Sequence, residues 1–290
     1  MKCEFAFVVL HYLAYEMTKK CVDTLLDNFD KVDNDIKIII VDNASPNNSG
    51  ELLALEYQLN SNVTLIKSDT NLGFARGNNL GYKYAVETYS PTFVVVMNND
   101  VLIVQEDFLI KIKEIYGRTN FGVLGPDIYC PLKGIHQSPS RIIGLTKDEL
   151  LAIRKKRVND NYKLILKRLF RSPNKIPTYK NSDYKIELDN PVLHGACYIF
   201  SSLFINKRKE CFCNRTFLYL EEDILHYECL QEGIKMVYSP EISVNHLEDV
   251  STKLAYQDEI KRRKNKNTQV IKSIDVLLSI MKKENENMRQ

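Results

Sequence analysis

The chain has 290 residues, 44% of them hydrophobic and 27% charged, and its formal net charge is +3. A chain of this length can bury the core of one large domain, and so small a charge means that any basic partner-binding surface must come from local clustering. No apolar run reaches the roughly 18 residues that a membrane-spanning helix needs. The first residues, with acidic Glu4 and no small-residue cleavage site, do not form a signal peptide. The seven scattered cysteines indicate free thiols in a reducing cytoplasm.

Strand and helix patterns alternate as far as about residue 125. The predicted strands are residues 5–10, 36–41, 63–66 and a run that starts at Phe93. The predicted helices are residues 16–29, 51–59, about 80–87 and 105–116. Strands separated by helices of roughly ten residues form βαβ units with right-handed crossovers, so a parallel sheet is expected.

Polar residues follow each predicted strand. The clusters are His11-Tyr12, Asp42-Asn43, Asp69–Asn79 and, directly after the apolar run Phe93–Met97, Asn98-Asn99-Asp100. The carboxyl ends of parallel strands lie on one edge of a sheet, and open α/β sheets bind their ligands there. The sequence therefore predicts a ligand crevice along that edge.

The alternation stops near Pro126, and a basic segment follows. Residues Lys147–Lys175 hold ten Lys or Arg against three Asp or Glu, and Arg154–Arg171 has the pattern of a basic helix with an apolar stripe. Such a helix is either solvated and packed on the domain, or it binds a membrane surface or an anionic acceptor. Both interpretations stay open, while a nucleic-acid partner is not expected beside a carboxylate-rich crevice.

Regular patterns return in the last third of the chain. A strand is predicted at residues 192–201, a helix at 224–230, a short strand at 236–238 and a final helix at 268–283. The apolar positions of the last helix could dock on the body of the protein, on a second subunit or on a membrane surface.

Several polar residues suit specific chemistry. A carboxylate at a strand end, such as Asp100, suits Mg²⁺ or Mn²⁺, which proteins hold with one or two carboxylates plus phosphate oxygens. Asp42 either caps a turn or accepts a hydrogen bond from the base or a ribose hydroxyl of a nucleotide. In residues 71–81, three glycines allow the backbone to approach a ligand closely, and the guanidinium of Arg76 can bind phosphate through two N–H groups. This spacing differs from the dinucleotide fingerprint GxGxxG and from a P-loop.

A carboxylate cluster, Glu221-Glu222-Asp223, opens the helix predicted at residues 224–230. Acidic residues stabilise a helix N-terminus, and adjacent carboxylates also repel one another, which raises one pKa and suits a general base. His246 follows another strand and is either structural or a ligand of metal or phosphate.

Seven segments, in this order, carry a family resemblance. They are VVLHY (8–12), IIIVDNASPNNS (38–49), NLGFARGNNLG (71–81), VVVMNNDV (94–101), HGACYIF (194–200), FLYLEEDI (217–224) and VNH (244–246). Together they resemble the inverting family 2 glycosyltransferases with the GT-A fold, especially the rhamnosyltransferase-like branch that builds bacterial capsule and O-antigen chains.

The resemblance implies an α/β fold of the GT-A type. Its central sheet is expected to be Rossmann-like, mostly parallel and flanked by helices, with a basic helical insertion and a C-terminal helical tail. The expected domain spans residues 1–253, with a nucleotide-sugar half at 1–127, the basic insertion at about 130–190 and an acceptor and catalytic half at 191–253. The tail is residues 254–290.

The resemblance also implies roles for individual residues. The catalytic base is Asp223 or Glu222, the acceptor contacts are His194 and Gly195, and the ligands of a divalent cation are Asp100 and His246. The expected nucleotide-sugar contacts are Leu10, His11, Asp42, Asn43, Asn71, Gly73, Arg76, Asn78, Asn98 and Asn99. The first residue of the metal motif is Asn98 instead of the usual Asp, which leaves Asp100 to carry the charge.

The implied activity is transfer of a sugar from a UDP- or dTDP-sugar to a hydroxyl of a glycan or lipid-linked acceptor, assisted by Mg²⁺ or Mn²⁺, in cell-surface polysaccharide synthesis. The alternative is a catalytically weak nucleotide-sugar-binding subunit of a polysaccharide assembly complex. A cytoplasmic enzyme is expected. Peripheral binding at the inner face of the cell membrane and formation of a homodimer stay open.

Overall fold

The computed structural model describes residues 3–29, 35–167, 183–247 and 258–287. Within these ranges ten strands form a single mixed sheet with the order β3-β2-β1-β4-β9-β6-β10-β5, while β7 pairs with β6 and β8 with β10. The strands are β1 Phe5–His11, β2 Ile36–Asp42, β3 Val63–Lys67, β4 Phe93–Asn98, β5 Val101–Leu102, β6 Val123–Cys130, β7 Ile135–His136, β8 Leu188–Asp189, β9 Cys197–Ser201 and β10 Met236–His246.

The helices alternate with the strands in the first half of the chain, as predicted. They are α1 Tyr15–Phe29, α2 Ser49–Glu56, α3 Gly73–Tyr89, α4 Phe108–Thr119, α5 Lys147–Lys167, α6 Ser202–Lys207, α7 Glu221–Gln231 and α9 Glu259–Asn287. One 3₁₀ turn spans Asp183–Lys185.

The first four strands form the parallel half of the sheet. β1 pairs in parallel with β2 on one side and with β4 on the other, and β2 pairs in parallel with β3. Six of the seven residues of β1 are buried, because helices cover both faces of this half. The predicted mostly parallel α/β sheet is therefore confirmed.

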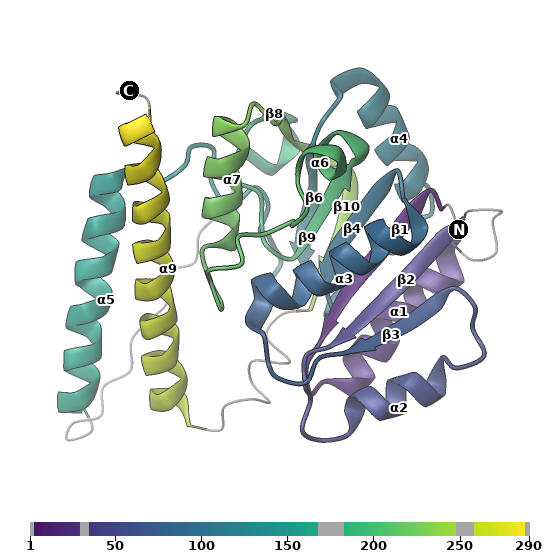
Figure 1. Cartoon of the computed structure of the whole chain (residues 1–290), viewed down its shortest axis with the longest axis horizontal. Coiled ribbons are helices and arrows are strands. Elements are labelled where there is room, and N and C mark those ends of the chain that lie inside the picture. The colour runs from purple at the N-terminus through teal and green to yellow at the C-terminus, as the bar shows by residue number, and fades with distance from the viewer. Residues whose placement is uncertain (1–2, 30–34, 168–182, 248–257, 288–290) are drawn as a thin grey trace.

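Alternate residues of the strands divide the core into two layers. Phe5, Phe7 and Val9 of β1 pack in a cluster with buried residues of α1, α2 and α4, whereas Ala6 and Val8 pack with α3, α6 and α7. This alternation follows from the two-residue period of a strand. The result is a sheet between two helical layers (Figure 1).

The second half of the sheet was predicted only in part. β9 lies antiparallel between β4 and β6, and β6 lies parallel to β10. No strand is predicted at β6, because Gly125-Pro126 interrupts its apolar run. The register of β10 shifts between Ser239 and Ser243 opposite Pro126, and this bulge accommodates a residue that has no N–H to donate.

Several predicted boundaries are wrong. α3 begins at Gly73, so most of the stretch predicted as a loop before residue 80 is helical. β9 begins at Cys197, not at residue 192, and β10 continues to His246. α7 begins at Glu221, and α9 begins at Glu259.

The basic insertion and the C-terminal tail form a helix pair. Arg154 of α5 donates to Asp275 of α9 at 2.7 Å, and Arg157 of α5 donates to Asn267 of α9 at 3.3 Å. Buried Leu150 of α5 shares a hydrophobic cluster with Ile224 of α7 and with residues of α9. Figure 1 shows the two long helices side by side, next to α7.

The predicted apolar stripe of the basic segment is only partly described. Tyr162 is 65% exposed, and the side chains from Ile165 to Phe170 lie outside the described residues. No helix in the described ranges is long and apolar enough to cross a membrane. All seven cysteines are free thiols.

Candidate active site

The polar strand ends predicted to meet do lie along one edge of the sheet. His11 is the register partner of Asp42, and Leu10 is the partner of Asn98. The segment before β9 lies at the same edge, because the backbone N–H of Asn98 donates to the carbonyl of Ala196 at 2.9 Å. His194 and Gly195 therefore lie next to the carboxyl end of β4.

Asp42 has one carboxylate oxygen available for a ligand. The side chain is fully buried, Oδ1 accepts from the backbone N–H of Ser45 at 3.1 Å, and Oδ2 has no hydrogen-bond partner among the described residues. A Cβ added at Gly50 would overlap Oδ2. An unpaired buried acceptor carries a desolvation cost of about 1–3 kcal/mol, so a ligand that donates a hydrogen bond to Oδ2 gains an unusually favourable contact.

Asn43 and Asn71 shape the turn that leads into α3. The side-chain oxygen of Asn43 accepts from Leu72 N at 2.8 Å, and that of Asn71 accepts from Gly73 N at 2.9 Å. Gly73 has a φ of 79°, and a Cβ there would overlap the carbonyl of Phe217. Glycine is required because the segment before α7 passes directly against this turn.

The other residues predicted to contact the nucleotide sugar differ in solvent exposure. Arg76 is exposed, and its Nε donates to the carbonyl of Leu72 at 3.1 Å. Asn78 is only 1% exposed, its Nδ2 donates to Phe74 O at 3.0 Å, and its Oδ1 has no partner. Leu10 is partly buried and faces Gly77, where a Cβ would lie 2.6 Å from Leu10 Cδ1.

His11 is completely buried and both ring nitrogens have partners. Nδ1 lies 2.7 Å from Thr18 Oγ1, and Nε2 lies 2.7 Å from Ser49 Oγ. Asn99 also donates to Thr18 Oγ1, at 2.8 Å. Burial lowers the pKa of His11 to about 4 against the opposing effect of Asp42. A neutral ring in this network links the end of β1 to α1, to the start of α2 and, through Thr18, to the residue after β4.

Asp100 and His246 form the polar pair beside β4. His246 Nε2 lies 3.2 Å from Asp100 Oδ1, and both residues are less than 10% exposed. His246 Nδ1 lies 2.8 Å from Gln137 Oε1, which fixes the ring from its other side. The half-buried His194 stacks edge-on at 5.8 Å from the His246 ring, and burial, followed by His246, lowers its pKa to about 3.

This pair fits a divalent cation that is completed by its substrate. Asp100 Oδ1 is buried and accepts no hydrogen bond of good geometry, and the neutral form of a histidine ring is a metal ligand. Among the described residues no group of three or more His, Cys, Asp or Glu could hold an ion. Mg²⁺ and Mn²⁺ typically take the rest of their ligands from phosphate oxygens and water.

The three adjacent carboxylates of α7 have three different environments. Burial raises the pKa of Glu221 to about 8, with a further contribution from Glu222. Burial and the charge of Asp223 raise the pKa of Glu222 to about 7. Burial also raises the pKa of Asp223, while Arg141 opposes that shift by pairing with its carboxylate.

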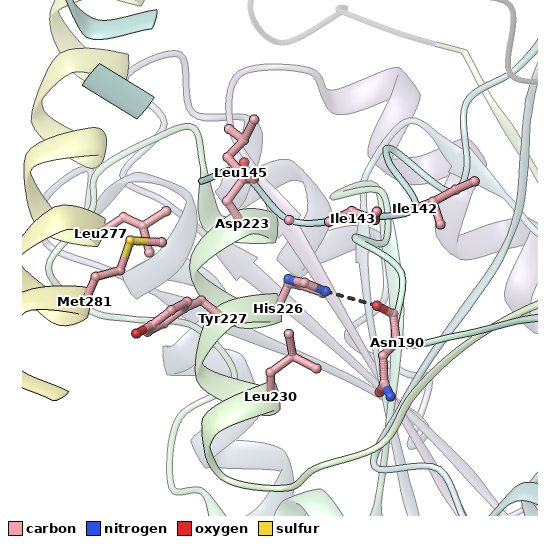
Figure 2. Close-up of a pocket in the computed structure, with 11 residues that line it drawn as sticks. Ile142, Ile143, Leu145, Asn190, Asp223, His226, Tyr227, Leu230, Leu277 and Met281 are labelled. Carbon is pink, nitrogen blue, oxygen red and sulfur yellow. Dashed lines mark hydrogen bonds between the residues drawn. The ribbon is translucent and has the colours of Figure 1, made fainter. Parts of the chain in front are cut away.

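Glu222 and Asp223 point toward different surroundings. Glu222 Oε2 lies 3.8 Å from the position of a Cβ on Gly195, beside the end of β4. Asp223 lines a cavity of about 350 Å³ with His226, whose Nε2 lies 3.0 Å from the carbonyl of Asn190. Figure 2 shows Asp223, His226, Tyr227 and Leu230 on α7 across from Leu277 and Met281 of α9.

Arg141 and Gln137 belong to this region but were absent from the prediction. They follow β7 in an irregular segment, and Arg141 is held by a single antiparallel bridge to Val192. No spacing or motif marks either residue. Only the position of α7 against this segment brings Arg141 to Asp223.

Residues 6–184 match the family model described as Glycosyl transferase family 2. The chain belongs to glycosyl transferase family 2. The low-salt glycan biosynthesis hexosyltransferase Agl10 of Haloferax volcanii is 27% identical over 247 residues, which cover 78% of this chain and 69% of that protein. This family 2 chain is therefore a glycosyltransferase, as the resemblance implied.

The fold of this family 2 glycosyltransferase is similar to that of S. aureus TarS. The TarS 1–349 structure has a TM-score of 0.52 and 10% identity over 84% of this chain, and the same fragment with UDP-GlcNAc gives 0.52 and 12% over 87%. The chain spans 60% of the first of these structures and 61% of the second. The likeness confirms the GT-A fold.

Proposed function

We propose that this family 2 enzyme transfers a hexosyl or deoxyhexosyl unit from a UDP- or dTDP-sugar to a hydroxyl of a glycan or lipid-linked acceptor, with inversion at the anomeric carbon. The main support is the carboxylate of Glu222 beside Gly195, at the sheet edge that also carries Asp100 and His246. The hexosyltransferase name of the Haloferax relative and the TarS complexes with UDP and UDP-GlcNAc agree with this class. A role in cell-surface polysaccharide synthesis is part of the proposal.

The donor occupies the edge formed by β1, β2 and α3. Oδ2 of Asp42 accepts from the base or the ribose, because it is the Asp42 oxygen that has no hydrogen-bond partner among the described residues. Asn43, Asn71 and Gly73 hold the turn that allows the backbone to approach the donor, and exposed Arg76 offers its guanidinium to phosphate. Three of the remaining predicted residues are buried and shape this pocket without contacting the ligand; they are His11, Asn78 and Asn99. Leu10 and Asn98 are partly exposed, so they can also contact the ligand.

Asp100 and His246 would hold a divalent cation, Mg²⁺ or Mn²⁺. Bound there, the ion supplies Lewis-acid stabilisation of the diphosphate leaving group. His246 is oriented for this role by Gln137, which contacts Nδ1, while Nε2 lies on the side of Asp100.

Glu222 is the better candidate for the catalytic base. Asp223 is paired with Arg141, whereas the Glu222 carboxylate is half-buried and faces Gly195. A base with a pKa of about 7 is half ionised near neutral pH. Glu222 removes the proton of the acceptor hydroxyl at His194 and Gly195, that oxygen bonds to the anomeric carbon, and the bond to the nucleoside diphosphate breaks.

A donor panel tests the proposal. UDP- and dTDP-sugars are added with and without Mn²⁺, and both thermal stabilisation and release of nucleoside diphosphate are measured. Stabilisation that is confined to these sugars and enhanced by Mn²⁺, together with diphosphate release, is expected. Stabilisation without any release, even with glycan acceptors, supports the catalytically weak binding subunit instead, and no response to any donor contradicts both.

A further inference from the structure

A second polar cavity lies on the α9 side of the sheet edge. It has a volume of about 330 Å³ and is lined by Arg76, Asn214, Arg215, Thr216, Phe217, Gln269, Lys272 and Ser273. Three of these residues are cations, and none is an acid. The cavity includes none of Asp100, His246 and Asp42. Its Arg76 is the residue proposed above to contact the donor phosphate, so the cavity adjoins the donor site, and Arg215 and Lys272 are cations outside the proposed donor contacts.

Among the described residues, no ion pair neutralises the three cations of this cavity. Asp275, three residues beyond Lys272 on α9, pairs with Arg154 of α5. Arg215 donates to Ser279 Oγ at 2.7 Å, a neutral partner, and Lys272 has no recorded partner in the described part of the chain. Like charges gathered without a counter-charge repel, so an anion bound between them is favoured.

The cavity is connected to the proposed base by a short stretch of chain. Ser273 Oγ donates to the carbonyl of Leu218 at 3.2 Å, and Lys266 lies 5.3 Å from the centre of the Tyr219 ring. The charge of Lys266 also lowers the pKa of Glu222, against the larger effect of burial. Lys266, Gln269 and Ser273 are spaced i, i+3 and i+7, so one face of α9 runs from the neighbourhood of Glu222 to the cavity.

We propose that Arg215 and Lys272 of this cavity bind a phosphate or diphosphate group of the acceptor. This inference rests on the proposed function. The diphosphate of the nucleotide sugar is assigned to the cation at Asp100 and to Arg76, whereas Arg215 and Lys272 take no part in the donor contacts proposed above, so their charges are assigned to another phosphate. Such a group occurs in a prenyl-diphosphate-linked sugar and in a glycan with phosphodiester links, and both present the same charged oxygens to guanidinium and ammonium groups.

The test is a calorimetric titration with inorganic diphosphate in buffer of low ionic strength that contains EDTA. The wild-type protein is compared with Arg215→Ala/Lys272→Ala and with Lys209→Ala/Lys264→Ala, a control that removes the same two charges from exposed positions outside the cavity. A loss of affinity of at least about tenfold is expected for the first variant, which corresponds to roughly 1.4 kcal/mol. The control is expected to stay within about twofold.

Equal affinities in all three proteins would overturn the inference, and so would an equal loss in both variants. Lys272→Ala alone guards against misfolding, because the Lys272 side chain has no hydrogen bond or ion pair with another described residue, and it is expected to weaken binding by about threefold or more. Farnesyl diphosphate and glycerol 3-phosphate then distinguish the sources. Tighter binding of the first assigns a lipid diphosphate, and tighter binding of the second assigns a glycan phosphate.

The proposed function is tested separately by release of nucleoside diphosphate from the wild-type protein. If the wild type turns over no donor but the titration still depends on Arg215 and Lys272, the proposed function fails and the anion site remains. If donor is turned over but neither residue affects binding of diphosphate, only the acceptor-phosphate inference fails.

Discussion

His246 Nε2 lies 3.2 Å from Asp100 Oδ1, although 145 residues separate them between the carboxyl end of β4 and the last residue of β10. The backbone supports this contact, because His246 is the register partner of Val101 and Leu247 N donates to the carbonyl of Asp100 at 2.9 Å. A carboxylate and an imidazole are thus held together by the sheet itself, beside His194.

Replacing Asp100 is expected to remove the charge that holds the cation. Asp100→Asn should lower kcat by roughly 10²–10³, the usual effect of losing preorganised charge stabilisation. It should also abolish the increase in melting temperature that Mn²⁺ gives with a UDP- or dTDP-sugar. The control is Asp148→Asn, because Asp148 is exposed on α5. Near-normal turnover of Asp100→Asn at saturating Mn²⁺ would contradict the assignment.

Glu222 is expected to control the pH dependence of transfer. The base must be ionised, and its pKa is raised to about 7, so kcat/KM should rise about tenfold per pH unit below pH 7 and level off above it. Glu222→Gln should lower kcat by roughly 10²–10⁴ and remove this rise. A pH–rate profile from pH 5.5 to 8.5 measures both effects.

Asp223→Asn serves as the matched variant, since Asp223 is adjacent but paired with Arg141. It should retain the rise near pH 7 even if its rate falls. If Asp223→Asn removes the rise and Glu222→Gln retains it, Asp223 is the base.

Glu221 is expected to make the fold less stable at alkaline pH. Burial raises its pKa from 4.5 to about 8, so the folded state binds more protons than the unfolded state between these values, and the free energy of unfolding falls as pH rises through this window. Glu221→Gln should therefore raise the free energy of unfolding at pH 8.5 relative to the wild type by at least about 1 kcal/mol.

At pH 4.5 the gain from Glu221→Gln should be much smaller, because the carboxyl is then protonated in the folded wild type. Glu16→Gln, an exposed change at the start of α1, should alter neither value. Denaturant unfolding at the two pH values measures the difference. A gain that is the same at both would show that Glu221 does not titrate in this window.

Gly50 is expected to leave the space that Asp42 Oδ2 needs in order to contact the nucleotide sugar. In Gly50→Ala the new methyl group would overlap Asp42 Oδ2, so the carboxylate must move and the KM for the nucleotide sugar should rise by about tenfold, the equivalent of one lost hydrogen bond of roughly 1.4 kcal/mol. Initial rates at varied donor concentration measure this.

Gly117→Ala is the control for the change at Gly50, because both glycines lie in helices and a Cβ at Gly117 meets nothing within 4 Å. It should stabilise the protein by up to about 1 kcal/mol through helix propensity and leave the KM unchanged. Equal KM values for the two variants would remove Asp42 from the donor site.

The parallel half of the fold was predictable because its signals are local. Buried strands such as Phe5–His11 and Ile36–Asp42 are nearly continuous apolar runs, and helices with their own period follow them. The polar strand ends at Asp42 and Asn98 were predictable for the same reason, since parallel strands direct their carboxyl ends to one edge. Strand β6 was not predictable, because Pro126 interrupts its apolar pattern and is accommodated only by a bulge in β10.

The sequence by itself determined the family, the βαβ order and which polar residues gather at the sheet edge, because these follow from residue spacing along short segments. Only the tertiary structure decided that Arg141 pairs with Asp223, that Glu222 faces Gly195 and that α5 packs on α9. Three adjacent carboxylates are nearly equivalent in a linear chain. They become different when helix α7 places each in its own surroundings, because burial and the nearest charge set each pKa.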